Sequence, residues 1–227
     1  MLTLYELNTM LTNDSLANDK ALKEYKEAKA YYHGHQLATQ ELEKLARRGQ
    51  IPIYENIYKM ICDKILGYKI QSLQEIKVSG RQEQDKPLAN LLNDLLRVFN
   101  SQKDYEKEIY KRDFDLLMGQ AVIELWVNKD KQGDFHISLK SLNNESFLID
   151  TYSVDKNALD SNRFHKKQNL SYLEARLLLG ENVDIFQNGN TIVDNRVDII
   201  ETWIREYDEE VEEKFSWNRY LWHTIGG

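Results

Sequence analysis

Two histidines, His33 and His35, are the first side chains whose type could support chemistry, because imidazole nitrogens commonly bind zinc. On a helix, side chains two residues apart point about 200° away from each other and cannot share a metal ion. On a strand the pair would still need a third and a fourth ligand, yet the chain has no H-E-x-x-H motif and a single cysteine. We therefore interpret the pair as scaffold and expect no metal there.

Two aspartates, Asp113 and Asp115, form a second pair within "YKRDFDLLMG". Two-metal nucleases and nucleotidyltransferases use paired carboxylates, usually together with a third acid. Here Lys111 and Arg112 precede the pair in a helical stretch, so a solvated helix face is the simpler interpretation. A metal-dependent nucleic-acid enzyme that uses Asp113 and Asp115 stays open as an alternative function.

Three further aspartates, Asp150, Asp155 and Asp160, recur at intervals of five in a loop. They lack the glycine and the terminal glutamate of a calcium-binding EF-hand loop, whereas Asp and Asn side chains commonly close turns. The chain also has no G-x-S-x-G, P-loop or G-x-G-x-x-G motif. We interpret Cys62 as a small buried apolar residue. These patterns predict a protein that is not an enzyme, with no cofactor and no metal.

The overall composition limits the class of protein further. The 227 residues include 37 acidic and 30 basic side chains, a net charge of −7, which argues against a tight grip on nucleic acid but suits a surface that repels DNA phosphates. The single cysteine excludes an internal disulfide and is typical of a reducing cytoplasm. No apolar run approaches the roughly 18 residues of a membrane span, and the N-terminus lacks the basic region of a signal peptide.

The predicted secondary structure changes from helices to strands along the chain, which predicts an α+β fold. Residues 1–119 read as mainly helical, with a helix after Pro52 that ends at Gly67, a short strand over 68–78, and a helix over 103–118 that closes at Gly119. Pro87 opens a strongly amphipathic stretch over 88–99, whose apolar face suits a second alternative, a monomeric helical adaptor.

The second half has the period of two that is typical of strands. Residues 120–195 are predicted to hold a β-hairpin turning near Gly133, a short strand, and a helix opened by the capping box of Ser171 and Glu174 and ended by Gly180. Residues 196–227 are predicted to form a second hairpin. Its tip carries five carboxylates, at Asp208, Glu209, Glu210, Glu212 and Glu213. Tryptophans in the strand-like runs are expected to anchor sheet packing or a subunit interface, namely Trp126, Trp203, Trp217 and Trp222.

The order of these segments resembles the amino-terminal part of a portal protein, the head-to-tail connector of tailed bacteriophages, in the short-tailed-phage branch. The resemblance rests on "YYHGHQ" followed by "RRGQIPIYENIYKMICDKILGY", then "DYEKEIYKRDFDLLMGQAVIELWV", then "SLNNESFLIDTYSVDKNALDSNRFHKKQNLSYLEARLLLG", and finally "VDIIETWIREY". It covers Tyr31 to Tyr207. It implies a wing-like helical region, a wing-like and clip-like β region, and a helix junction packed by Tyr31, Tyr32 and Gln36.

The resemblance implies a structural subunit without catalytic activity. Copies of the chain, usually twelve, would form a ring at one capsid vertex, through which duplex DNA passes without sequence-specific binding during packaging and genome ejection. The implied partners are terminase, capsid and tail or adaptor proteins, with no membrane and with assembly in the cytoplasm of the bacterial host. The charge run at the acidic tip is typical of a solubilising turn, and the alternative hypothesis is that the tip faces the channel mouth or the terminase. Family members are longer, so we expect this chain to be a fragment or a shortened prophage copy.

Overall fold

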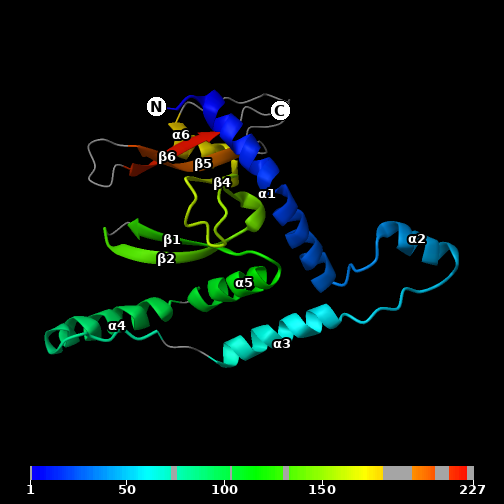
Figure 1. Ribbon diagram of the computed structural model, residues 1–227, viewed down its shortest axis with the longest axis horizontal. Helices are drawn as coiled ribbons and strands as arrows, with labels where there is room; N and C mark the ends of the chain where they lie inside the picture. Colours follow the sequence, from blue (N-terminus) through cyan, green and yellow to red (C-terminus); the bar gives the residue numbers. More distant parts are fainter. Residues whose placement is uncertain are drawn as a thin grey trace. The chain divides into compact units, whose positions relative to one another are not determined.

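The computed structural model describes residues 2–72, 76–102, 104–129, 133–180, 196–207 and 215–223. Helices dominate the first half and antiparallel strands the second, as Figure 1 shows, which confirms the predicted α+β class. The helical half contains α1 (Leu4–Tyr32), α2 (Thr39–Arg47), α3 (Ile57–Gln71), η1 (Glu83–Asp85), α4 (Lys86–Asn100) and α5 (Tyr105–Leu117). The second half contains β1 (Val122–Lys129), β2 (Phe135–Leu142), η2 (Asn144–Ser146), β3 (Phe147–Ile149), β4 (Arg163–Ser171), α6 (Tyr172–Leu179), β5 (Arg196–Tyr207) and β6 (Phe215–His223).

The chain divides into two compact units that do not follow chain order. Residues 1–22 and 143–227 form one, here called the sheet unit, and residues 23–142 form the other, the helical unit. These boundaries differ from the predicted regions 1–119, 120–195 and 196–227. The seam expected near Gly119 lies inside the helical unit. The assignment of wing-like and clip-like regions stays a prediction.

The sheet unit is built on a four-stranded antiparallel sheet in the order β3-β4-β5-β6. Its register places His165 between Leu148 and Thr202, and Thr202 opposite Tyr220. Because strand side chains alternate between faces, the even-numbered residues of β5 share one face. That face meets the first turns of α1 in a core of Leu7, Leu11, Leu148, Ile200, Ile204 and Trp222.

The opposite face of the sheet is partly covered by α6, where Ala175 packs against Ile199. The predicted capping box is confirmed, because the Ser171 hydroxyl accepts from the Glu174 N–H and the Glu174 carboxylate accepts from the Ser171 N–H. Gly180, at a φ of 69°, ends the helix as expected. The predicted hairpin of residues 196–223 is also present, since β5 and β6 pair from Ile199 with His223 to Tyr207 with Phe215.

The helical unit packs around Tyr25, Cys62 and Met118. Cys62 is only 4% exposed, which confirms that it is a buried apolar residue, and burial raises the pKa of its thiol. Gly119 follows α5 at a φ of 136°, where a glycine is required, and β1 and β2 form the predicted hairpin. None of the helices in the described ranges combines the length and the apolar character that crossing a bilayer requires.

The strand predicted over 68–78 is wrong where it overlaps α3, which runs through Gly67 to Gln71. A glycine inside a helix costs only about 1 kcal/mol relative to alanine, so it does not by itself end one. The helix ends at Ser72, whose N–H and hydroxyl both donate to the Tyr68 carbonyl. Residues 76–80 belong to no regular element.

Candidate functional site

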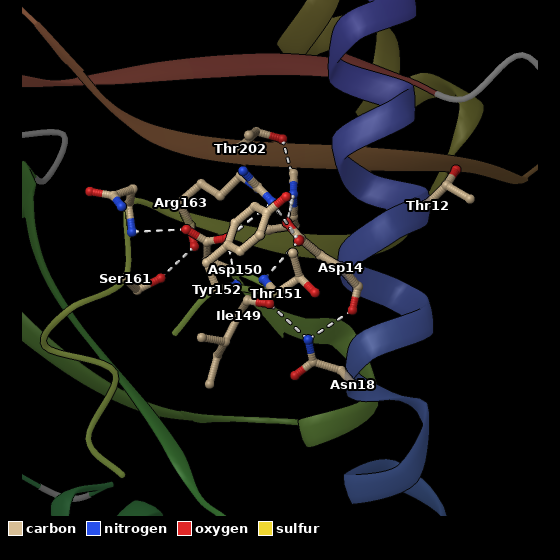
Figure 2. Close-up of polar contacts among 12 residues, drawn as sticks. Thr12, Asp14, Asn18, Ile149, Asp150, Thr151, Tyr152, Ser161, Arg163 and Thr202 are labelled. Carbon is tan, nitrogen blue, oxygen red and sulfur yellow. Dashed lines mark hydrogen bonds and ion pairs between the residues drawn. The ribbon is translucent and has the colours of Figure 1, made fainter. Parts of the chain in front are cut away.

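Buried charged and polar side chains form a hydrogen-bonded network inside the sheet unit (Figure 2). Asp14 of α1 is fully buried and accepts two hydrogen bonds from Arg163 of β4, at 2.6 Å from Nε and 2.8 Å from Nη2. Asp14 follows Leu7 and Leu11 by seven and three residues, so it lies on the helix face that packs on the sheet. The α1 core stripe therefore carries one carboxylate into the interior.

Asp150, at the end of β3, supplies a second carboxylate to the same guanidinium, with Oδ1 3.0 Å from Arg163 Nη2. Backbone N–H groups satisfy the remaining acceptors. The N–H of Thr151 donates to Asp14, and those of Tyr152 and Asn162 donate to Asp150. One guanidinium thus pairs with two buried carboxylates, and hydrogen bonds from backbone N–H groups further offset the cost of burying those charges.

His165 extends the network across the sheet. Its Nε2 lies 3.0 Å from Asp14 Oδ2, and its Nδ1 lies 2.9 Å from the Thr202 hydroxyl. Trp222 of β6 donates from Nε1 to that hydroxyl at 2.9 Å. With the imidazole proton on Nε2, Trp222 donates to Thr202, Thr202 donates to Nδ1, and Nε2 donates to Asp14. Each of these four side chains then has a hydrogen-bond partner in the network.

The pKa of Asp14 records the balance of forces in this network. Burial raises the pKa of the carboxyl group, but the hydrogen bonds from Arg163, His165 and the Thr151 N–H outweigh that effect and lower it to about 2. The hydrogen bond to Asp14 raises the pKa of Arg163 above its ordinary value. Both shifts favour the charged pair, so the network is a permanent ion pair at neutral pH.

The network is suited to holding α1 on the sheet rather than to acid–base chemistry. Both nitrogens of the His165 ring already have partners and the ring is fully buried, so neither nitrogen is open to a substrate. Asn18, one turn after Asp14, adds a hydrogen bond from Nδ2 to the Ile149 carbonyl at 2.7 Å. Sequence reasoning missed Asp14, Arg163 and His165; the available signal was a carboxylate on the apolar stripe of Leu7 and Leu11.

The prediction that aspartate side chains close turns in the loop after β3 is confirmed by the contacts of Asp155 and Asp160. Asp160 accepts hydrogen bonds from the Ser153 hydroxyl and from the N–H groups of Val154 and Asp155. The Val154 N–H is the main cause of the lowered pKa of Asp160. Asp155 accepts from the Asn157 N–H. Asp155 and Asp160 thus close turns within the loop, whereas Asp150 also pairs with Arg163 in the buried network.

A helix junction in the helical unit is organised by one asparagine. Asn56 caps α3 by accepting from the Lys59 N–H at 3.0 Å, and its Nδ2 donates to the carbonyls of Tyr31 and Tyr32 at the end of α1. Gln36 donates to Asn56 Oδ1 at 3.0 Å. Asn56 therefore satisfies the end of one helix and the start of another with a single side chain.

The three residues that the resemblance placed at this junction lie there in different settings. The Tyr32 ring packs edge-to-face on Phe114, and its hydroxyl donates to Asp63 at 2.6 Å, which raises the pKa of Tyr32 to about 12. Tyr31 contributes its carbonyl, while its side chain is exposed. Their use in an interface between subunits stays a proposal.

The two pairs of residues considered for metal chemistry are not brought into a common site. His33 and His35 are exposed beyond the end of α1. Asp113 is buried in α5 and forms ion pairs with Lys69 and Arg112. Asp115 accepts from the Tyr25 hydroxyl at 2.7 Å. Among the residues that the structure describes, no group of three or more His, Cys, Asp or Glu side chains could hold a metal ion.

The candidate interface tryptophans lie on different surfaces. Trp203 and Trp217 are on the sheet face opposite Asp14, where Trp217 stacks on Phe164 at 5.7 Å and is 45% exposed. Trp203 donates to Glu201, which also accepts from Arg219. Trp126 is half-exposed on β1 in the helical unit.

The acidic tip lies outside the described residues, namely Asp208, Glu209, Glu210, Glu212 and Glu213.

Comparisons with known proteins add an independent observation. The family described as phage P22-like portal protein matches residues 8–220 of this chain. The portal protein of Helicobacter pylori bacteriophage KHP30 is 48% identical over 225 residues, which cover 96% of this chain and 37% of that relative. The chain therefore spans a little over a third of the length of the curated relative that it matches.

Proposed function

The chain belongs to the phage P22-like portal protein family, and from this premise we propose that it is a structural subunit of a portal ring at one capsid vertex. Duplex DNA would pass through the ring during packaging and ejection without sequence-specific binding. The family match over residues 8–220 carries the proposal, because it includes both compact units. The other copies in the ring, terminase, capsid and tail proteins are the proposed partners, with assembly in the cytoplasm of the bacterial host.

The use of polar side chains supports a structural role. The buried charges of the sheet unit join α1 to strand β4 and to the end of β3. In the helical unit, Asp115 and the buried Asp113 connect α5 to α1 and α3. A catalytic pair of carboxylates would have to share a metal or a substrate. Asp113 and Asp115 instead contact different partners on different helices.

Particle imaging of the purified product of the whole gene tests the proposal directly. We expect rings with a central hole and a mass that is a multiple of the subunit mass, as mass photometry would measure. A strictly monomeric product would overturn the ring and favour a helical adaptor. Divalent-metal-dependent nuclease activity that Asp113→Ala abolishes would favour the enzyme alternative.

We propose further that the acidic segment between β5 and β6 acts at the channel mouth or on the terminase. Uncompensated carboxylates repel DNA phosphates, so such a segment would let DNA pass without adhesion. Changing Glu209 and Glu210 to Gln is expected to lower the amount of DNA packaged per head severalfold while leaving the thermal unfolding midpoint unchanged. The matched control changes two exposed glutamates elsewhere, Glu43 and Glu55, to Gln. Equal packaging by both variants would contradict this role.

A further inference from the structure

Helix α4 presents its most apolar stripe to solvent rather than to its own unit. Its inward side consists of Ala89, Asn93, Leu96 and Asn100, and Asn93 exchanges hydrogen bonds with the backbone of Val78 at 2.8 and 2.9 Å. The outward stripe lies about 100° around the helix and consists of five side chains that are 38% to 66% exposed, Leu88, Leu91, Leu92, Leu95 and Val98. We call these five residues the α4 stripe.

Helix α3 of the same unit carries a second outward apolar stripe. Its inward side is closed by Cys62 and Leu66, each 4% exposed. The outward side consists of five apolar side chains that are 47% to 62% exposed, Ile57, Met60, Ile61, Ile65 and Tyr68, here called the α3 stripe. Both helices are 15 residues long, so the two stripes match in length.

The size of each stripe matches the apolar part of one protein–protein interface. Five half-exposed apolar side chains amount to on the order of 400 Å², which is already large for one patch on a soluble monomer. A standard interface covers about 800 Å² on each partner, somewhat more than half of it non-polar, which is again about 450 Å². One stripe with a polar rim therefore suffices for one subunit contact.

A ring requires two different complementary surfaces on each subunit, because head-to-tail contacts join unlike faces. The two stripes provide such a pair. We propose that the α4 stripe of one copy packs against the α3 stripe of the neighbouring copy, an inference that rests on the proposed ring. Packing ridges of one apolar helix face into the grooves of another is the ordinary way in which two such helices associate.

Cross-linking between copies that each carry one added cysteine on the surface tests the pairing. Copies carrying Leu91→Cys are co-expressed with copies carrying Met60→Cys, and the whole gene product is treated with a short bismaleimide. We expect a covalent dimer from this mixture, and none from the unaltered chain, whose Cys62 is buried. Dimers formed by Leu91→Cys copies alone would indicate a two-fold contact and overturn the pairing, as would the absence of any dimer from the mixture.

A charge placed on the stripe gives a second measurement. Leu91→Asp is expected to reduce the ring fraction at least tenfold in particle counts, whereas Asn90→Asp, which adds the same charge to the other side of α4, should leave it unchanged. Because both positions are exposed, neither substitution should alter the unfolding midpoint of the subunit. Normal rings from Leu91→Asp would overturn the surface assignment alone. A lack of rings from the unaltered protein would instead count against the proposed function.

Discussion

Replacing Arg163 with methionine is expected to lower the free energy of unfolding of the sheet unit by about 3–5 kcal/mol, because the substitution leaves two buried carboxylates without their cation. Asp14 and Asp150 have side chains that are 0% and 2% exposed and both bind the same guanidinium. Methionine fills a similar volume, so the loss of unfolding free energy would come from the unpaired charges and not from a cavity. Urea denaturation of the variant and the unaltered chain measures the difference.

A matched control separates this effect from the general loss of an arginine. Arg205→Met, at an exposed position of β5, should cost less than about 1 kcal/mol, since among the described residues its guanidinium lies against the Phe215 ring at the surface. Adding Asp14→Asn to Arg163→Met should recover part of the loss, because one of the two repelling charges is removed. A cost for Arg163→Met no greater than that of the control would contradict the network's role.

The same network predicts how stability depends on acid. The pKa of Asp14 is about 2 in the folded chain and 3.8 when unfolded, so its contribution is complete above about pH 4 and disappears as the pH falls towards 2. The shift corresponds to about 2 kcal/mol over that interval. In Arg163→Met this acid dependence should shrink, since the main hydrogen-bond donor to Asp14 is gone.

Replacing Asn56 with alanine is expected to cost about 2–3 kcal/mol of the stability of the helical unit. About 1 kcal/mol comes from the lost cap on the Lys59 N–H, and the remainder from the Tyr31 and Tyr32 carbonyls, which lose their donor. The measurement is chemical denaturation together with hydrogen exchange, in which the Lys59 amide should exchange faster.

Serine at position 56 separates the contribution of the α3 cap from that of the hydrogen bonds to the α1 carbonyls. Asn56→Ser keeps an oxygen that can cap α3 but provides no amide donor for α1, so it should recover about 1 kcal/mol. Asn90→Ala, at an exposed position inside α4, serves as the control and should be neutral or slightly stabilising because alanine is the better helix former. If Asn56→Ala behaves like this control, the asparagine does not organise the junction.

Much of the fold could be predicted from local patterns. The period of two in 122–142 and 196–223 predicted two hairpins, and the capping box at Ser171 and the glycine at 119 predicted where helices begin and end; all of these are confirmed. The family resemblance, noted from the order of segments, is confirmed as well. The strand expected over 68–78 is wrong at 68–71, because Gly67 does not end α3, which continues to Gln71.

Patterns between residues a few positions apart were enough to predict the α+β class and the positions of most elements, and the order of the segments was enough to indicate the family. The folded structure was needed to show that residues 1–22 fold with 143–227, and that Asp14 meets Arg163 across 149 positions. It also showed that the α4 stripe points outward. The physical reason is that a periodic pattern reports which side chains share a face, whereas burial and ion pairing depend on which distant segment meets that face.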